Sequence, residues 1–195
     1  MQVICISGKA EAGKTTVGDM IHDELKFTHN KSVLFVNYGD VLKYVAKEWF
    51  DWDGIKDDAG RTLLQQLGTD KVRAQYPNFW SGFVQKLVNC FRDMWDYVII
   101  GDCRFSNEIT GWLSYDIVPI WLHVERPSYT SSLNTTQLMH SSEQGLLTQV
   151  DSNPALRVIH HNGFYTIDND STLITLRTKV QRWVATELPV NEAQL

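Results

Sequence analysis

A glycine-rich stretch near the start of the chain, from Gly8 to Thr15, has the residue types and spacing of a phosphate-binding loop. Its sequence, Gly-Lys-Ala-Glu-Ala-Gly-Lys-Thr, matches the pattern G-x-x-x-x-G-K-[ST] at every fixed position. Gly8 and Gly13 allow the backbone to curl so that several N–H groups point at one anion. In such a loop Lys14 contacts the β- and γ-phosphates of a nucleotide, and the Thr15 hydroxyl ligates Mg²⁺.

A second group with chemical potential follows a later apolar run. Tyr97 to Gly101 is apolar and ends in Asp102, with Arg104 two residues further on. A carboxylate at the end of a buried strand supports Mg²⁺ in phosphate-loop enzymes, directly or through water. A strand that merely ends in Asp is the alternative for this segment alone; the upstream loop favours the functional interpretation.

These residues need a scaffold of alternating strands and helices. Apolar periodicity predicts strands at 3–7, 32–37, 97–102, 117–124 and 164–167, and helices at 16–25, 40–50, 61–67, 79–94, 106–113 and 173–187. We expect Asp40 to cap its helix and Gly68 to end the helix at 61–67. Pro119 marks either the beginning of a strand or an edge. The alternation predicts an α/β fold, with a mainly parallel five-stranded sheet covered by helices on both faces.

The region from 127 to 156 is polar and weakly periodic, which predicts a small lid with one or two short helices. His160 and His161 are expected in a solvated turn before the last strand. A length of 195 residues fits one domain that includes this lid.

Composition restricts the partners. Lys and Arg total 18 against 23 Asp and Glu, a formal net charge of −5, which argues against stable binding of duplex DNA. The three cysteines lack metal-ligand spacing, and Cys5 and Cys103, in or beside predicted strands, are expected to be buried reduced thiols. No apolar run approaches the length of a membrane span, so we expect no membrane association and a cytoplasmic protein. The seven tryptophans suit core packing and permit a homodimer.

The sequence resembles the deoxynucleoside monophosphate kinases of bacteriophages, within the phosphate-loop nucleoside monophosphate kinase group. The resemblance runs along nearly the whole chain. It is carried by the Gly8–Thr15 loop, Gly39-Asp40-Val41-Leu42-Lys43, Arg61-x-x-Leu64-Gln65-x-Leu67-Gly68-Thr69-Asp70 with Trp80, Gly101-Asp102-x-Arg104-Phe105-x-Asn107-Glu108, His123-Val124-x-Arg126-Pro127, His140-x-Ser142-Glu143 and Ile167-x-Asn169-Asp170. Ser106 and Ser171 stand where relatives often have proline and glycine, and the segment from 49 to 61 is short for the family.

The resemblance implies a three-layer α/β/α kinase fold that transfers a phosphoryl group from ATP to a deoxynucleoside monophosphate with Mg²⁺, in the host cytoplasm if the gene is a phage gene. The residues expected to bind ATP are Gly8, Lys9, Ala12, Gly13, Lys14, Thr15 and Thr16. Those expected at the acceptor are Asp40, Lys43, Arg61, Arg104 and Glu108. Lys14, Asp102 and Arg104 are the expected catalytic residues, with Thr15 and Asp102 at the metal.

Several of these residues have a second interpretation. Arg61 is equally well explained as an exposed helix residue, and Asp40 as a helix cap. Arg126, His140 and Glu143 are assigned to the lid, where Arg126 either enters the site or pairs with a neighbouring glutamate. The His140/Glu143 pair does not predict a metal site, because no third ligand has suitable spacing.

Two other functions fit the same fold. The acceptor can be an alcohol, such as a hydroxymethylated base in DNA, which would need Asp40 or Asp102 as a base. Alternatively, the chain binds ATP without catalysis. The presence of Lys14, Thr15, Asp102 and Arg104 together argues against a non-catalytic module.

Overall fold

The computed structural model describes residues 1–130 and 145–190. Its centre is a five-stranded sheet in which every neighbouring pair of strands is parallel, in the order β2-β3-β1-β4-β5. The strands are β1 Gln2–Ser7, β2 Val33–Val36, β3 Tyr97–Cys103, β4 Ile120–Glu125 and β5 Phe164–Asp168. The predicted α/β class and the parallel sheet are therefore confirmed. β1 lies between β3 and β4, which places the loop that follows it at the crevice where such sheets bind ligands.

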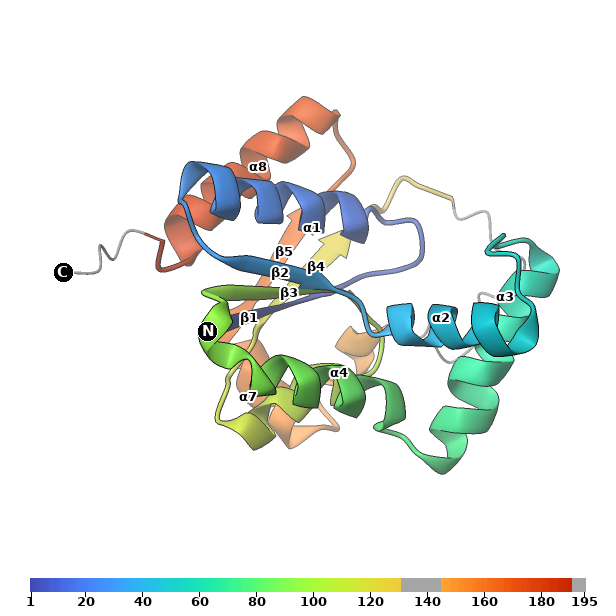
Figure 1. Ribbon diagram of the computed structural model, residues 1–195. Helices are drawn as coiled ribbons and strands as arrows, with labels where there is room; N and C mark the ends of the chain where they lie inside the picture. Colours follow the sequence, from blue (N-terminus) through green and yellow to red (C-terminus); the bar gives the residue numbers. More distant parts are fainter. Residues whose placement is uncertain (131–144, 191–195) are drawn as a thin grey trace.

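Helices cover both faces of the sheet, which makes three layers (Figure 1). On one face lie α1 (Lys14–Asp23) and α8 (Leu173–Glu187), and on the other lie α4 (Phe79–Cys90), α5 (Ser106–Thr110) and α7 (Pro154–Gly163). Alternate residues of β1 enter the two cores: Ile4 and Ile6 pack under α1, and Val3 and Cys5 pack on the other side. A strand buried on both faces needs apolar residues at successive positions, as Val3 to Ile6 of β1 have.

Two further helices, α2 (Gly39–Phe50) and α3 (Asp58–Gln65), lie beyond the carboxyl ends of the strands (Figure 1). They form a small core of their own, in which Ala46, Trp52 and Leu67 are buried. The N-cap of α2 is Tyr38, so the helix begins one residue before the predicted cap Asp40, which lies in the first turn.

The helix predicted at 61–67 is longer at both ends. Asp57 caps α3 by accepting the Gly60 N–H at 2.7 Å, so the helix begins at Asp58. Beyond Gln65 it continues as a π-helix, Gln66–Arg73, and Gly68 does not end it. Gly68 instead permits close packing, because a Cβ there would lie 2.6 Å from Leu42 Cδ2.

Helix α7 (Pro154–Gly163) has no counterpart among the helices predicted from the sequence. Asn153 caps this helix by accepting the Leu156 N–H at 3.1 Å, and Pro154 begins it. His160 belongs to this helix rather than to a turn, and its ring stacks on Phe164 with 4.3 Å between centroids. Leu156 is fully buried, so the end of the region predicted as a lid contributes to the core. The central part of that region, with His140 and Glu143, lies outside the described residues.

The remaining elements agree closely with expectation. α1 continues into a π-helix, Glu24–Thr28, and short 3-10 helices occur at Arg92–Met94, Gly111–Tyr115 and Leu146–Gln149. Pro119 directly precedes β4, which is an inner strand, so the proline marks a strand beginning and not an edge. Within the described residues, no helix combines the length and apolarity needed to cross a bilayer.

Candidate active site

The glycine-rich loop between β1 and α1 has the conformation that its sequence predicts. Gly8 and Gly13 have φ angles of 144° and 95°, and a side chain on either would collide with a neighbour: the Val124 carbonyl for Gly8 and the Asn169 amide for Gly13. Asn169 Nδ2 donates a 2.8 Å hydrogen bond to the Ala12 carbonyl. The loop therefore lies close against Val124 in β4 and is hydrogen-bonded to Asn169, which follows β5.

Lys14 is folded back over this loop. Its Nζ donates hydrogen bonds to the carbonyls of Gly8 at 2.7 Å and Lys9 at 2.8 Å. Burial, followed by the charge of Arg104, lowers the pKa of Lys14 to about 8. An ammonium that burial destabilises gains more from an incoming phosphate than an exposed one would.

Asp102 is the second-last residue of β3 and faces the start of α2. Its Oδ1 accepts the Tyr38 N–H at 2.8 Å and its Oδ2 accepts the Gly39 N–H at 2.9 Å. Burial raises the pKa of the Asp102 carboxyl, although these two hydrogen bonds and the neighbouring cations oppose the shift. The carboxylate thus holds the N-terminus of α2 against the sheet, where the helix dipole also favours negative charge.

Glu108 supports the segment that follows β3 through hydrogen bonds to its backbone. Its Oε2 accepts the backbone N–H groups of Arg104 at 2.6 Å and Phe105 at 3.0 Å, and its Oε1 pairs with Arg73 Nη2 at 2.7 Å. Only 3% of Glu108 is exposed, and burial raises the pKa of its carboxyl. The Arg73 guanidinium lies 4.0 Å from the centre of the Phe105 ring. Glu108 therefore positions Arg104 and Arg73 through these bonds.

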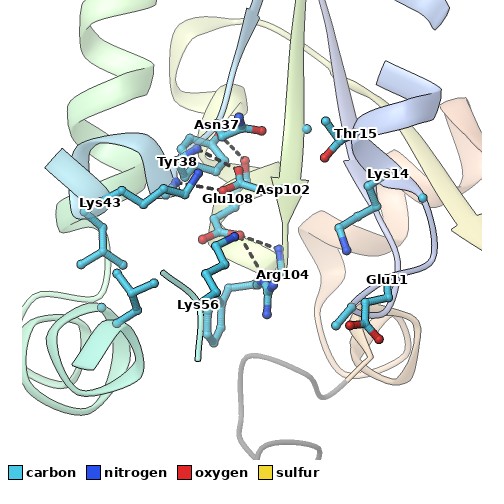
Figure 2. A pocket seen from close by; sticks show the side chains of 18 of the residues that line it. Glu11, Lys14, Thr15, Asn37, Tyr38, Lys43, Lys56, Asp102, Arg104 and Glu108 are labelled. Atoms are coloured by element: carbon cyan, nitrogen blue, oxygen red, sulfur yellow. Dashed lines mark hydrogen bonds between the residues drawn. The ribbon is translucent and has the colours of Figure 1, made fainter. Parts of the chain in front are cut away.

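One pocket of about 750 Å³ is lined both by the glycine-rich loop and by the segment from Asp102 to Glu108. Figure 2 shows Lys14 and Thr15 on one side, Lys43 on the other, and Asp102 and Arg104 between them. The charged side chains that line it are Lys14, Lys43, Lys56, Arg61, Arg73, Arg104 and Arg126, with Glu11, Asp102 and Glu108. Cations outnumber carboxylates, although the whole chain is acidic. Such a site concentrates positive charge for more than one anionic group.

Lys56 is a pocket residue that the sequence analysis missed. It lies in the loop before α3, where Trp52 Nε1 donates to the Ile55 carbonyl at 2.9 Å and Arg61 Nε donates to the Lys56 carbonyl at 3.0 Å. Burial lowers the pKa of Lys56, followed by the charges of Lys43, Arg104 and Arg61. Lys56 and Arg61 therefore belong to one cation cluster, although no motif marks Lys56.

One part of the pocket wall carries apolar and aromatic side chains. It is lined by Leu42, Leu64, Gln65, Trp80 and Phe105. The Trp80 indole N–H donates to the Gly68 carbonyl at 3.1 Å, so the π-helical turn that contains Gly68 fixes the ring. Flat apolar walls with a nearby amide suit a heterocyclic base.

The structure brings most of the predicted site residues together. Those that line the pocket are Gly13, Lys14, Thr15, Thr16, Lys43, Arg61, Asp102, Arg104, Glu108 and Arg126. Gly8, Lys9 and Ala12 form the loop behind it. Asp40 does not line this pocket: it accepts hydrogen bonds from Lys43 at 2.7 Å and from the Asn37 side chain at 3.1 Å, and it borders a smaller hollow of about 430 Å³. His140 and Glu143 lie outside the described residues.

The fold is similar to solved kinase structures. A sugar kinase from Janibacter sp. HTCC2649 superimposes with a TM-score of 0.52 at 13% sequence identity, over 97% of this chain and 98% of that one. Thymidylate kinase from Ehrlichia chaffeensis gives a TM-score of 0.48 at 15% identity, over 94% and 98% of the two chains. No protein-family model and no curated protein sequence matches the chain. The likeness to the sugar kinase shows a shared α/β fold, and the resemblance to the bacteriophage kinases stays a prediction from the motifs of the chain.

Proposed function

We propose that this chain is an ATP-dependent kinase that transfers the γ-phosphoryl group of ATP to a deoxynucleoside monophosphate, giving ADP and the diphosphate. One observation carries the proposal: a single pocket unites the phosphate-binding loop, a second cluster of cations and a flat, largely apolar end. These three parts match a triphosphate, an acceptor phosphate and a base. The motifs that resemble the bacteriophage kinases support the same substrate class.

The chemistry follows from the charges. Two polyanions must be brought together, so their repulsion has to be screened before an acceptor oxygen reaches the γ-phosphorus. In our proposal, the loop amides and Lys14 hold the donor, while Arg104, Arg61 and Lys56 hold the acceptor phosphate. As the new P–O bond forms and the bond to ADP breaks, Lys14 and Arg104 stabilise charge on the transferred group. The acceptor phosphate is already an anion near neutral pH, so it needs no general base.

The residues present also suit a magnesium ion. Thr15 offers a hydroxyl at the start of α1, and Asp102 offers a carboxylate across the same pocket. In the described part of the chain no cluster of three His, Cys, Asp or Glu side chains forms a protein-built metal cage. Mg²⁺ needs no such cage, because it keeps several waters and binds through substrate phosphates and one or two protein oxygens. When bound, it neutralises charge on the β- and γ-phosphates. We assign Thr15 as its direct ligand and Asp102 as a ligand through water, since backbone N–H groups already bind both carboxylate oxygens.

An alcohol acceptor is less well supported. It would need a carboxylate placed to take the hydroxyl proton. Backbone N–H groups occupy both oxygens of Asp102, Glu108 is engaged with Arg73 and two amides, and Asp40 borders a different hollow. The carboxylates therefore favour an acceptor that arrives as an anion.

The test is an acceptor screen. Purified protein is incubated with ATP, Mg²⁺ and each deoxynucleoside or ribonucleoside monophosphate in turn, and ADP and diphosphate are measured. We expect turnover with at least one deoxynucleotide and its loss in Lys14→Ala, by roughly 1,000-fold in kcat, because that variant removes a cation that binds the transferred group. Lys26→Ala, an exposed lysine at the far end of the α1 segment, is the control and should keep full activity. ATP binding without product from any acceptor would instead indicate the non-catalytic module.

A further inference from the structure

A polar side chain lies in the core directly before the glycine-rich loop. Ser7 is the last residue of β1 and is only 1% exposed, next to a run from Val3 to Ile6 that is fully buried and apolar. A hydroxyl in such surroundings costs free energy unless it is hydrogen-bonded. The partners of Ser7 therefore bear on the loop that follows it.

Two residues of β4 bind this hydroxyl. Strands β1 and β4 are parallel neighbours, with Cys5 opposite Trp121 and Ser7 opposite His123. The Trp121 indole N–H donates to Ser7 Oγ at 2.6 Å, and His123 Nδ1 lies 2.8 Å from the same oxygen. Trp121 is fully buried and His123 is partly buried. Ser7 is thus bonded to the strand that runs beside the loop.

The direction of the Ser7–His123 bond follows from which atoms can donate. An indole N–H only donates, so Ser7 Oγ accepts from Trp121 and keeps its own hydrogen for another acceptor. Among the described residues, His123 Nδ1 is the second partner of this hydroxyl. Burial is the main cause that lowers the pKa of His123, so the ring is neutral at neutral pH. Nδ1 is then the acceptor, and the ring hydrogen is on Nε2.

We infer that Ser7 and His123 are positioning residues, whose hydrogen bond holds the start of the glycine-rich loop in the shape that binds the donor phosphates. The inference rests on the proposed function, in which this loop binds ATP. Gly8, directly after Ser7, packs against Val124, directly after His123. The Gly8 carbonyl in turn accepts a hydrogen bond from Lys14 Nζ at 2.7 Å. A shift of Ser7 would therefore displace a carbonyl that orients the phosphate-binding lysine.

The first measurement is nitrogen NMR of the histidine rings of the full chain at neutral pH. The chain has six histidines, so the His123 signal is assigned by its loss in His123→Asn. We expect an unprotonated Nδ1 and a hydrogen on Nε2 in the wild type. In Ser7→Ala the donor to Nδ1 is gone, and the ring should become a mixture of its two neutral tautomers.

The second measurement is calorimetry of the binding of a non-hydrolysable ATP analogue with Mg²⁺. Ser7→Ala and His123→Phe should each raise the dissociation constant about tenfold, because each leaves a former partner unpaired in the core. The double variant should raise it by no more than about tenfold, since both residues act through one bond.

A conservative variant and a control separate positioning from packing. His123→Asn should bind the analogue nearly as well as wild type, because Asn Oδ1 is as many bonds from the backbone as His Nδ1 and can accept the Ser7 hydrogen. His161→Phe, an exposed histidine on α7, is the matched control and should keep full affinity. Thermal unfolding of each variant reports any loss of stability separately.

Three results would overturn the inference. The first is a wild-type His123 ring that carries its hydrogen on Nδ1. The second is a His123→Asn variant that binds as weakly as His123→Phe. The third is a Ser7→Ala variant that loses stability but binds the analogue as tightly as wild type, which would make the pair packing residues only. A wild type that binds no ATP analogue would instead refute the proposed donor site, and the role of the pair with it. The NMR result, which needs no nucleotide, distinguishes that failure from failure of the hydrogen bond.

Discussion

The two halves of the pocket are built in different ways. The half that we assign to the donor is made mainly by backbone groups of one continuous loop, Gly8 to Thr15, between one strand and one helix. The half that we assign to the acceptor is made by side chains from several segments, from Lys43 on α2 to Arg104 after β3. A backbone-built site depends on few residue identities, whereas a site built from side chains depends on each supporting contact. The comparison predicts that a substitution in one half will weaken binding of one substrate and leave binding of the other nearly unchanged.

Glu108→Gln is the substitution that should damage the acceptor half most. It leaves the Arg73 guanidinium without its buried partner and weakens the bonds to the Arg104 and Phe105 amides. Breaking a buried pair costs about 3 kcal/mol, so we expect a loss of that order in the free energy of unfolding. The KM for the acceptor should rise, while ATP affinity stays within a factor of a few because the loop is untouched.

Denaturant unfolding and calorimetry of ATP-analogue binding measure the two effects. Glu48→Gln, on the exposed side of α2, is the control and should change neither. If Glu108→Gln weakened ATP binding as strongly as acceptor binding, the two halves would not be separable.

Arg104→Gln tests the same half without removing its support. The Arg104 side chain lines the pocket between the loop and α2 (Figure 2). Burial of this guanidinium is the main cause that lowers its pKa. Loss of a charge-assisted contact to phosphate costs about 2–3 kcal/mol. We therefore expect kcat/KM for the acceptor to fall roughly 100-fold, with ATP affinity nearly unchanged.

Steady-state kinetics with each substrate varied in turn checks this. Arg61→Gln is the comparison variant, since Arg61 lines the same pocket from α3 and its Nε is bonded to the Lys56 carbonyl. Its effect should be smaller. If Arg104→Gln lowered the affinity for ATP as much as it lowered kcat/KM for the acceptor, this arginine would be assigned to the donor instead.

The same contrast explains what the sequence could predict. The glycine loop, the strands beside it and α8 were predicted because each is encoded by a short stretch of residues. Lys56 was not, because its place depends on Trp52 bonding to Ile55 and on α3 beginning at Asp58 rather than at Arg61. The role of Glu108 was assigned to the acceptor directly, whereas its carboxylate acts through Arg73 and two amides.

Helix α7 was missed for a different physical reason. Only Leu156 and Ile159 of this helix are buried. The start signals were present, with Asn153 as the cap and Pro154 in the first turn. The segment was divided between the predicted lid, which ends at 156, and a predicted turn at His160 and His161, whereas packing on β4 and β5 holds it as one helix.

The smallest expected effect is a pH dependence of nucleotide binding at the glycine-rich loop. The pKa of Lys14 is lowered to about 8 by burial and by the charge of Arg104. Below this pH the ammonium is present to meet a phosphate, and above it the free protein loses the proton. A bound phosphate favours the charged form, so at pH 8 about half a proton should be taken up per nucleotide.

Calorimetry in two buffers of different ionisation enthalpy measures this uptake directly. The affinity for an ATP analogue should be flat near pH 7 and should fall above pH 8 by up to about tenfold per pH unit. In Lys14→Arg the guanidinium remains charged throughout, so both the proton uptake and the pH dependence should disappear, whatever the absolute affinity of that variant. An unchanged affinity from pH 7 to pH 10 in the wild type would show that Lys14 stays charged in the free protein, because its hydrogen bonds to the Gly8 and Lys9 carbonyls outweigh the effect of burial on its pKa.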